Sequence, residues 1–377
     1  MSNGRLSRRD FVKMALAGAG AAACPLAARA ARAAGKDAPR LSDHEALAYE
    51  KMAGQRVRCQ LCPRRCTVAD KQRGYCGVRE NQGGVYRTLV YARPCAMHTD
   101  PIEKKPLFHV LPGTSAFSIA TAGCNVECQF CQNWRISQSL PEELESSECP
   151  PAKVAELAKE YRCDTIAYTY GEPTVFYEYM LDCAREGKKV GVRSIVVSNG
   201  FINPEPMTAL CKELAAVKID LKAFSEEFYE KYVQGQLKPV LSTLELLKKL
   251  DMHTEIVNLL IPGLNDGADD VKKMCGWVLE KLGADVPMHF TRFHPAYKMT
   301  NLAATPIKSL ERARETAVAA GVHYAYAGNV AGHEYENTYC HNCKKKIVSR
   351  YSYRVTAIHV KDGRCEYCDT PIPGVWK

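Results

Sequence analysis

Residues 121–133 read TAGCNVECQFCQN, and this segment places Cys124, Cys128 and Cys131 on one short stretch. It directly follows Phe117–Ala120, a short apolar run with the composition of a β-strand. Four thiolates saturate a [4Fe–4S] cluster, so three thiolates on one loop leave one iron open to an outside ligand. A chance group of buried cysteines is the alternative. The C-x3-C-x2-C spacing, the aromatic Phe130 before the last cysteine and the preceding strand favour an iron–sulfur loop.

Beyond this loop the sequence alternates between strand-like and helix-like segments. We expect strands at Phe117–Ala120, Thr165–Tyr168, Ser194–Val197, Val217–Leu221, Thr254–Leu260, Pro287–Phe290 and His323–Ala325. We expect helices from Pro151 to about Tyr161 and at Val175–Glu186, Pro204–Ala215, Pro239–Leu250, Asp269–Leu282 and Pro306–Ala320. Repeated β/α units imply a parallel sheet with right-handed crossovers. Residues 116–330 hold six or seven units, so the predicted fold class is α/β, a partial (β/α)6 TIM-like barrel.

Polar motifs follow several of the expected strands. The motifs are Tyr170-Gly171-Glu172-Pro173, Ser198-Asn199-Gly200, Lys218-Ile219-Asp220-Leu221-Lys222, Leu260-Ile261-Pro262-Gly263 and Arg292-Phe293-His294-Pro295. Each has a structural alternative: a turn, a tight Asn-Gly turn, a salt bridge at the barrel rim or a satisfied histidine. Barrels of this kind place their active sites at the carboxyl ends of the strands. Agreement among five loops on one rim therefore favours a functional interpretation.

The cysteine spacing with Phe130 resembles the signature of the radical S-adenosylmethionine (SAM) superfamily, and the nearest subgroup resembles the activating enzymes of pyruvate formate-lyase type. The resemblance implies a [4Fe–4S] cluster on the three cysteines whose open iron binds the amino and carboxylate groups of SAM. The reduced cluster would then split SAM into methionine and a 5′-deoxyadenosyl radical that abstracts hydrogen. The cofactor supplies this radical chemistry, and the protein supplies orientation and a dry pocket.

The same resemblance implies roles for residues on the rim. Residues 170–173 are similar to a Gly-Gly-Glu-Pro motif that holds the SAM amino group, with Tyr170 in place of the first glycine. Ser198 and Asn199 belong to a loop similar to the family's Thr-Asn-Gly loop. Asp220 and Lys222 would face the SAM carboxylate or a neighbouring cation, and His294 would contact SAM. The implied cofactor-binding residues are Phe130, Gly171, Glu172, Pro173, Ser198, Asn199, Asp220, Lys222 and His294.

Eight more of the 18 cysteines form two groups with metal-ligand spacing. Cys340-x2-Cys343 and Cys365-x2-Cys368 are separated by 21 residues, the spacing of a zinc ribbon, with rubredoxin-like iron or disulfides as alternatives. Near the N-terminus, Cys59, Cys62, Cys66 and Cys76 offer four thiolates in a spacing that matches no standard ferredoxin run. Zinc, an auxiliary Fe–S cluster and no metal all stay open for this second group.

A more specific resemblance covers nearly the whole chain after residue 34. Its motifs are Cys-x2-Cys-Pro-Arg-Arg-Cys from Cys59, residues 74–79, residues 100–107, Gly328-Asn329-Val330 and the terminal cysteine pairs. They are similar to the radical SAM enzyme of the AmmeMemoRadiSam system, which implies Memo-like and AMMECR-like proteins, or a protein substrate, as partners. A flavodoxin or ferredoxin would be the reductant. Two other functions stay open: a glycyl-radical-enzyme activase, and a non-catalytic Fe–S protein for electron transfer or assembly.

Composition separates the leader from the rest of the chain. The formal charge is +9, but residues 1–34 supply +5 of it, and no basic stripe interleaved with aromatics indicates nucleic-acid binding. Ser7-Arg8-Arg9-Asp10-Phe11 resembles a twin-arginine export signal, which predicts export to the periplasm. The cytoplasm is the alternative, because SAM and reductant are supplied there. We expect no transmembrane segment beyond the leader.

Four regions follow from these patterns. The predicted boundaries are 1–34 for the leader, 35–115 for a cysteine-rich N-terminal extension, 116–330 for the partial barrel and 331–377 for a zinc-ribbon-like C-terminal module.

Overall fold

The computed structural model describes residues 41–377. The predicted leader, residues 1–34, lies outside the described residues, so its twin-arginine assignment stays a prediction. Among the helices of residues 41–377, none has the length and apolar run that a membrane span needs.

The central element is one eight-stranded sheet in the order β14-β13-β12-β11-β10-β9-β8-β7. Its strands are β7 (Ala96–Pro101), β8 (Ser115–Ala120), β9 (Thr165–Tyr168), β10 (Arg193–Ser198), β11 (Ala216–Asp220), β12 (Thr254–Leu260), β13 (Met288–Arg292) and β14 (Ala325–Gly328). The strands from β8 to β14 are parallel, and β7 pairs antiparallel with β8. Within the described chain, no pairing joins β14 to β7. The sheet is therefore an open, partial barrel with six crossovers.

All seven predicted strands are present, which confirms the fold class. Parallel strands are buried on both faces of the sheet, so continuous apolar and β-branched runs form them, as in β9 and β12. The last strand lies later than predicted: it begins at Ala325, whereas we expected His323–Ala325. The antiparallel edge strand β7 was not predicted.

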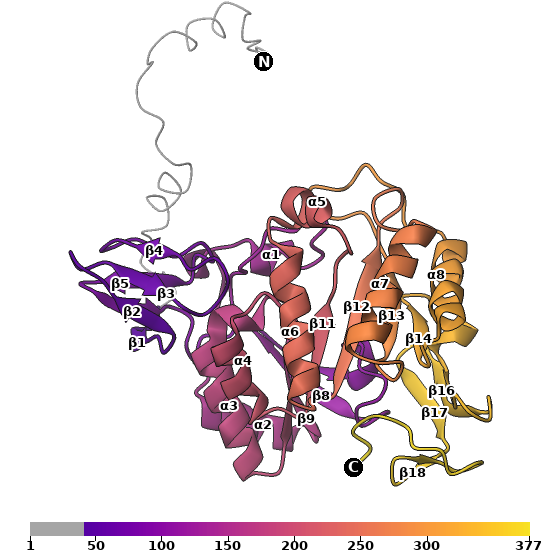
Figure 1. Cartoon of the computed structure of the whole chain (residues 1–377). Helices are drawn as coiled ribbons and strands as arrows, with labels where there is room; N and C mark the ends of the chain where they lie inside the picture. The colour runs from indigo at the N-terminus through magenta and orange to yellow at the C-terminus, as the bar shows by residue number, and fades with distance from the viewer. Residues whose placement is uncertain (1–40) are drawn as a thin grey trace, which may run out of the picture. The chain divides into compact units, whose positions relative to one another are not determined.

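Helices lie between successive parallel strands, along one face of the sheet (Figure 1). The main helices are α2 (Pro151–Glu160), α3 (Tyr177–Lys189), α4 (Pro204–Cys211), α6 (Leu237–Lys249), α7 (Ala268–Lys281) and α8 (Ile307–Ala320). Shorter helices are α1 (Trp134–Ser137), α5 (Glu226–Phe228), η2 (Ile102–Lys104), η3 (Pro141–Glu143), η4 (Pro173–Phe176), η5 (Tyr229–Val233) and η6 (Glu334–Glu336). Crossovers of one hand place successive helices on the same face. The opposite face of the sheet is left to line the interior of the partial barrel.

Small sheets flank the barrel at both ends of the described chain. The N-terminal ones are built from β1 (His44–Glu45), β2 (Tyr49–Lys51), β3 (Val57–Cys59), β4 (Thr67–Val68), β5 (Arg79–Gln82) and β6 (Val85–Thr88). The C-terminal ones are built from β15 (Thr338–Tyr339), β16 (Lys346–Tyr351), β17 (Arg354–Ile358), β18 (Val360–Lys361) and β19 (Arg364–Cys365).

The C-terminal strands are joined to the barrel by buried polar contacts. The buried Arg350 of β16 donates to the Phe108 carbonyl at 2.7 Å and lies 3.7 Å from the carboxylate of Glu103, which is also buried. The amide of Val375 donates to the His109 carbonyl at 2.7 Å. The boundaries predicted at residues 115 and 330 stay predictions.

Candidate functional site

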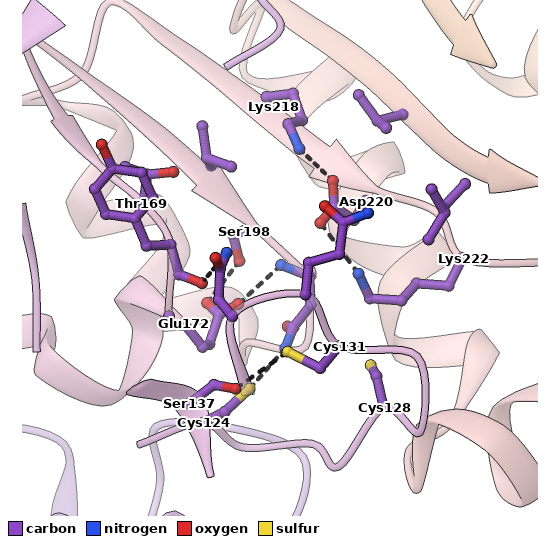
Figure 2. Close-up of a pocket in the computed structure, with 18 of the residues that line it drawn as sticks. Cys124, Cys128, Cys131, Ser137, Thr169, Glu172, Ser198, Lys218, Asp220 and Lys222 are labelled. Carbon is purple, nitrogen blue, oxygen red and sulfur yellow. Dashed lines mark hydrogen bonds and ion pairs between the residues drawn. The ribbon is translucent and has the colours of Figure 1, made fainter. Parts of the chain in front are cut away.

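A cavity of about 430 Å³ opens at the carboxyl ends of the parallel strands. Its lining comes from the loop after β8, the loops after β9 and β10, and the ends of β11 to β14. The side chains of these elements point toward one another across the cavity (Figure 2). The lining includes the three predicted cluster ligands and seven of the predicted cofactor-binding residues: Cys124, Cys128, Cys131, Phe130, Gly171, Glu172, Ser198, Asn199, Asp220 and Lys222.

The cysteine loop is anchored on both sides of its thiols. The amide of Gly123 donates to the Ile136 carbonyl at 3.1 Å, and the amide of Glu127 donates to the Val233 carbonyl at 2.9 Å. The Cys131 thiol lies 3.2 Å from the Ser137 hydroxyl. Burial raises the pKa of Cys128 to about 12, with the Lys222 ammonium opposing the shift. The Cys128 thiol is thus protonated unless a metal holds it as a thiolate.

The spacing of these thiols fits a cluster better than a single ion. Among residues 41–377, cysteine sulfur atoms that all lie within 4.8 Å of one another occur as a group only at the C-terminal cysteine pairs. The three loop thiols therefore do not form the closed set that a single tetrahedral ion requires. A four-iron cluster is held by thiolates on separate irons, and three thiolates on one loop are a donor set that such a cluster takes.

Gly123, just before the first ligand, has a conformation that an L-residue rarely adopts. Its φ is +92°, and a Cβ placed there would lie 2.6 Å from Val78 Cγ1 and 2.7 Å from the Cys76 carbonyl oxygen. Only glycine meets both conditions at low cost. The cysteine loop and the N-terminal extension are thus in backbone contact at this point.

Glu172 is a buried acceptor for four hydrogen bonds. Oε1 accepts from the Thr174 amide at 3.0 Å, the Thr174 hydroxyl at 2.7 Å and the Ser198 hydroxyl at 2.7 Å. Oε2 accepts from the Asn199 amide at 2.8 Å. Burial raises the pKa of Glu172 against these bonds. With both oxygens engaged, Glu172 positions the loops after β9 and β10 rather than offering a free carboxylate.

Asn199 connects this network to the cysteine loop. Its Nδ2 donates to Asn125 Oδ1 at 2.8 Å and lies 3.9 Å from Cys124 Sγ. Asn125 in turn donates to the Phe201 carbonyl at 2.7 Å. The two polar loops therefore hold each other in register beside the first cysteine.

Asp220 lies between two lysines at the end of β11. Its carboxylate accepts from Lys218 and, at 3.1 Å, from Lys222 (Figure 2). Burial alone would raise the pKa of Asp220, but the charges of the two lysines hold that pKa at about 2. The set of one carboxylate and two ammonium groups leaves a net positive charge on this wall of the cavity. Lys218 was quoted in the sequence motif but was not predicted as a site residue.

The wall formed by Tyr170 was missed as a site feature by sequence reasoning. Tyr170 has φ +64°, the left-handed conformation that a glycine would take at low cost. Its hydroxyl donates to Asp100, which also accepts from Lys105 at 2.6 Å and from Lys104 at 2.8 Å. Tyr170 thus adopts this conformation while its side chain is bonded to a segment 70 residues earlier in the chain.

The charges at this wall depend on one another. Burial alone would raise the pKa of Asp100, but hydrogen bonds from Lys104, Lys105 and Tyr170 hold it below its usual value. Burial lowers the pKa of Lys105 to about 8 despite its bond to Asp100. Lys104 and Lys105 both line the cavity. The residues 100–107 quoted from the sequence therefore build part of the candidate site.

The remaining predicted residues differ in their placement. Phe130 is buried in the cavity wall and packs on Phe228, with ring centroids 5.9 Å apart. Pro173 is buried at the start of η4 and His294 is exposed; neither lines the cavity. Their assignment to the cofactor stays a prediction.

The two outlying cysteine groups differ from each other. Cys340, Cys343, Cys365 and Cys368 place all four sulfur atoms within 4.8 Å, with Cys340–Cys368 at 3.6 Å and Cys343–Cys365 at 3.8 Å. A tetrahedral ion with Zn–S bonds of about 2.3 Å requires S–S distances of about 3.8 Å. This group therefore has the geometry of a closed single-ion site. The N-terminal cysteines line a separate, smaller cavity instead.

The chain is similar to a known superfamily and to two proteins of one archaeon. The Radical SAM superfamily profile matches residues 118–278. An uncharacterized protein of Methanocaldococcus jannaschii, MJ0808, is 44% identical over 330 residues, which cover 87% of this chain and 98% of that protein. A second uncharacterized protein of the same organism, MJ0674, is 29% identical over 122 residues, 31% of each chain.

Solved structures of radical SAM proteins are also similar. A domain of a pyruvate-formate lyase-activating enzyme from Bacteroides vulgatus is 16% identical with a TM-score of 0.39, over 43% of this chain and 98% of that chain. A radical SAM methyltransferase from Sphaerobacter thermophilus is 16% identical with a TM-score of 0.45, over 57% of this chain and 66% of that chain. By its superfamily domain and its near full-length archaeal relative, the chain is a radical SAM enzyme that belongs to the same family as MJ0808.

Proposed function

We propose that the chain binds a [4Fe–4S] cluster at Cys124, Cys128 and Cys131 and cleaves SAM reductively in the cavity above it. The observation that carries this proposal is the convergence of three loop thiols and the polar strand ends on one cavity of about 430 Å³. The donor set fits the cluster, because three thiolates hold three irons and leave the fourth for SAM.

When bound and reduced, the cluster would supply the electron that cleaves SAM into methionine and a 5′-deoxyadenosyl radical able to take a hydrogen atom from a substrate. The protein's own groups bind and orient. The lysines beside Asp220 would offer positive charge to the SAM carboxylate, and the loop of residues 170–171, which lines the cavity, would face its amino group. The enclosing walls exclude water, which protects a radical from side reactions.

The substrate of the radical is proposed from sequence resemblance alone. A Memo-like or AMMECR-like protein, or a peptide substrate, would approach the cavity mouth, where Lys104 and the hairpin residue Tyr353 are exposed. A flavodoxin or ferredoxin would supply the electron. Addition of purified partners of these classes is expected to raise the rate of SAM cleavage; partners that leave the rate unchanged are not substrates.

The C-terminal cysteine group is proposed as a structural zinc site, a zinc ribbon. The 3.6 and 3.8 Å sulfur distances support a tetrahedral ion with no open position. The group also contributes buried sulfur to the cluster of apolar residues that includes Tyr326 of β14 and Phe108, which lies between η2 and β8. Metal analysis of aerobically purified protein is expected to give one zinc per chain that is lost in Cys365→Ser. Iron in place of zinc would assign a rubredoxin-like site.

The test of the main proposal is product analysis after anaerobic loading with iron and sulfide. Incubation with SAM and dithionite is expected to yield 5′-deoxyadenosine and methionine in equal amounts. Cys128→Ser is expected to abolish both products. The matched control is Cys211→Ser, since Cys211 is half-buried on α4 and outside the cavity. An intact, reducible cluster that yields no 5′-deoxyadenosine, with partners present, refutes SAM cleavage and favours an electron-transfer role.

A further inference from the structure

Four cysteines of the N-terminal extension face one enclosed space. Cys59, Cys62, Cys66 and Cys76 all line it, and none forms a disulfide. Its other walls include Asn125 of the radical SAM cysteine loop and Val175 of η4. The space therefore lies between the extension and the barrel and is closed by both.

Local backbone geometry brings these cysteines together from two segments. The Cys59 amide donates to the Cys66 carbonyl at 2.9 Å, which closes a tight loop that contains Cys62. Arg65, within that loop, has φ +44°. The second segment turns at Gly77, with φ +74°, whose amide donates to the Gly74 carbonyl at 3.0 Å. Two tight turns thus present four sulfur atoms to one space, which is a common way to build a metal centre.

The spread of the sulfur atoms distinguishes this group from the C-terminal one. In the C-terminal group all four sulfur atoms lie within 4.8 Å of one another. In the part of the chain that the structure describes, no three of the N-terminal sulfur atoms do so. A zinc ion needs sulfur–sulfur distances of about 3.8 Å, whereas a four-iron cluster separates its thiolates by the width of the cluster. The N-terminal sulfur atoms therefore do not form the closed set that a single tetrahedral ion requires.

A buried cation faces the same space. Arg79 lines it, is fully buried and donates to both carboxylate oxygens of Glu178, with Nη1–Oε1 at 3.0 Å. The Arg79–Glu178 pair is therefore a fixed, buried part of the wall of this space.

The four-cysteine space is in direct contact with the SAM-cleaving site. The backbone of Gly123 packs on the Cys76 carbonyl, so close that a Cβ would lie 2.7 Å from it. Arg64, two residues after Cys62, donates to the Asn125 carbonyl at 2.6 Å. Asn125 directly follows Cys124 in the chain. One backbone contact and one hydrogen bond thus connect the two cysteine sets.

We propose that Cys59, Cys62, Cys66 and Cys76 bind a second [4Fe–4S] cluster that passes electrons to the cluster on Cys124, Cys128 and Cys131. Four thiolates leave it no open iron, so it carries electrons and does not bind SAM. A low-potential flavodoxin or ferredoxin reduces this cluster by one electron. The cluster is reoxidised when that electron moves to the SAM-binding cluster. The relay role rests on the proposed function, whereas cluster binding does not.

Metal content separates the two clusters. Wild-type protein loaded anaerobically is expected to hold about eight irons in two clusters, and the variant C124S/C128S/C131S about four, with the Mössbauer spectrum of a [4Fe–4S] cluster. The variant C62S/C76S is expected to keep about four irons on the other set. Cys211→Ser, outside both sites, is the control and is expected to match the wild type. The proposal is overturned if C124S/C128S/C131S binds no iron. In that case the N-terminal cysteines hold either a second zinc ion or no metal.

The relay is tested with two reductants on C62S/C76S. Dithionite is expected to support 5′-deoxyadenosine formation in this variant, since it reaches the SAM-binding cluster directly. Reduced flavodoxin is expected to support at least tenfold slower formation than in the wild type. Equal rates with flavodoxin overturn the relay. The variant could also lose 5′-deoxyadenosine formation with both reductants while it retains four irons and an unchanged circular dichroism spectrum. That result overturns the relay, because dithionite does not need one.

Discussion

Asp100 lets the stability of the cavity wall be tested quantitatively. Its carboxylate and the ammonium of Lys105 are both almost fully buried and 2.6 Å apart. Asp100→Asn removes the negative charge and leaves the Lys105 ammonium buried without an anion, in a site where burial already lowers its pKa to about 8. Breaking a buried ion pair from one side costs about 3–5 kcal/mol. We therefore expect a large loss of stability from a change of one atom.

The expected size can be read from a melting temperature. An unfolding entropy of about 2.1 cal/mol/K per residue gives about 0.7 kcal/mol/K for the described body, so the variant is expected to melt about 4–7 °C lower. The control is Lys104→Met, because Lys104 pairs with the same carboxylate but has a side chain 45% exposed. An exposed pair contributes about 0–1 kcal/mol, so its shift is expected to stay within about 1.5 °C.

Calorimetry of the loaded, anaerobic protein measures both shifts at one scan rate. The double variant Asp100→Asn with Lys105→Met removes the unpaired charge and is expected to recover most of the loss, because apolar replacement of a buried pair is often neutral. A shift no larger for Asp100→Asn than for Lys104→Met would refute the reasoning. So would a double variant that is less stable than Asp100→Asn alone.

Three further changes have expected outcomes. Glu255→Gln is expected to make the free energy of unfolding less dependent on pH below about pH 5. Burial opposes ionisation of Glu255, but bonds from two histidines hold the pKa of this carboxyl well below its usual value. Its stabilisation is therefore present above the unfolded pKa of about 4.3 and is lost as the pH falls. Urea midpoints at pH 4 and pH 7 measure it, and an unchanged pH dependence contradicts it. Gly123→Ala is expected to lower the iron content, because the new Cβ would lie closer than 3 Å to two atoms of the N-terminal extension. The control is Gly276→Ala in α7, whose Cβ would meet no atom within 4 Å. This control is expected to keep its full iron content and to gain up to about 1 kcal/mol in stability. Equal iron content in the two variants excludes a role for the close contact. Cys365→Ser is expected to lose the C-terminal metal and melt lower without changing the iron of the other sites; iron loss in this variant would show that the sites are not independent.

The strands and helices of the barrel could be predicted because their signals are local. Runs such as Thr254–Leu260 are apolar and β-branched, and a parallel strand is buried on both faces. The edge strand β7 could not be found in this way. Its six residues include Asp100 and Pro101, several side chains are exposed, and its pairing with β8 depends on the rest of the sheet. The same locality explains the late start of β14 at Ala325, since His323 and Tyr324 have strand-like composition outside the pairing.

The cysteine loop and the rim motifs were predictable as segments, but their contacts were not. The pattern around Glu172 predicts that it follows a strand. Only the fold shows that its oxygens accept hydrogen bonds from the backbone amides of Thr174 and Asn199. The link from Asp100 to Tyr170 spans 70 residues and has no local signal. Spacing indicated a zinc ribbon for the C-terminal cysteine pairs but left the N-terminal group open between zinc, a cluster and no metal. The structure adds that only the C-terminal group, among residues 41–377, brings its four sulfur atoms within 4.8 Å of one another.

The open iron on the loop of residues 121–133 is tested most directly by electron paramagnetic resonance of the reduced protein before and after addition of SAM. Wild-type protein and C62S/C76S are both expected to show a [4Fe–4S] signal whose g-values change when SAM is added. C124S/C128S/C131S is expected to show a signal that SAM leaves unchanged. A wild-type spectrum that is identical with and without saturating SAM, from a fully formed and reduced cluster, would contradict the binding of SAM at an open iron.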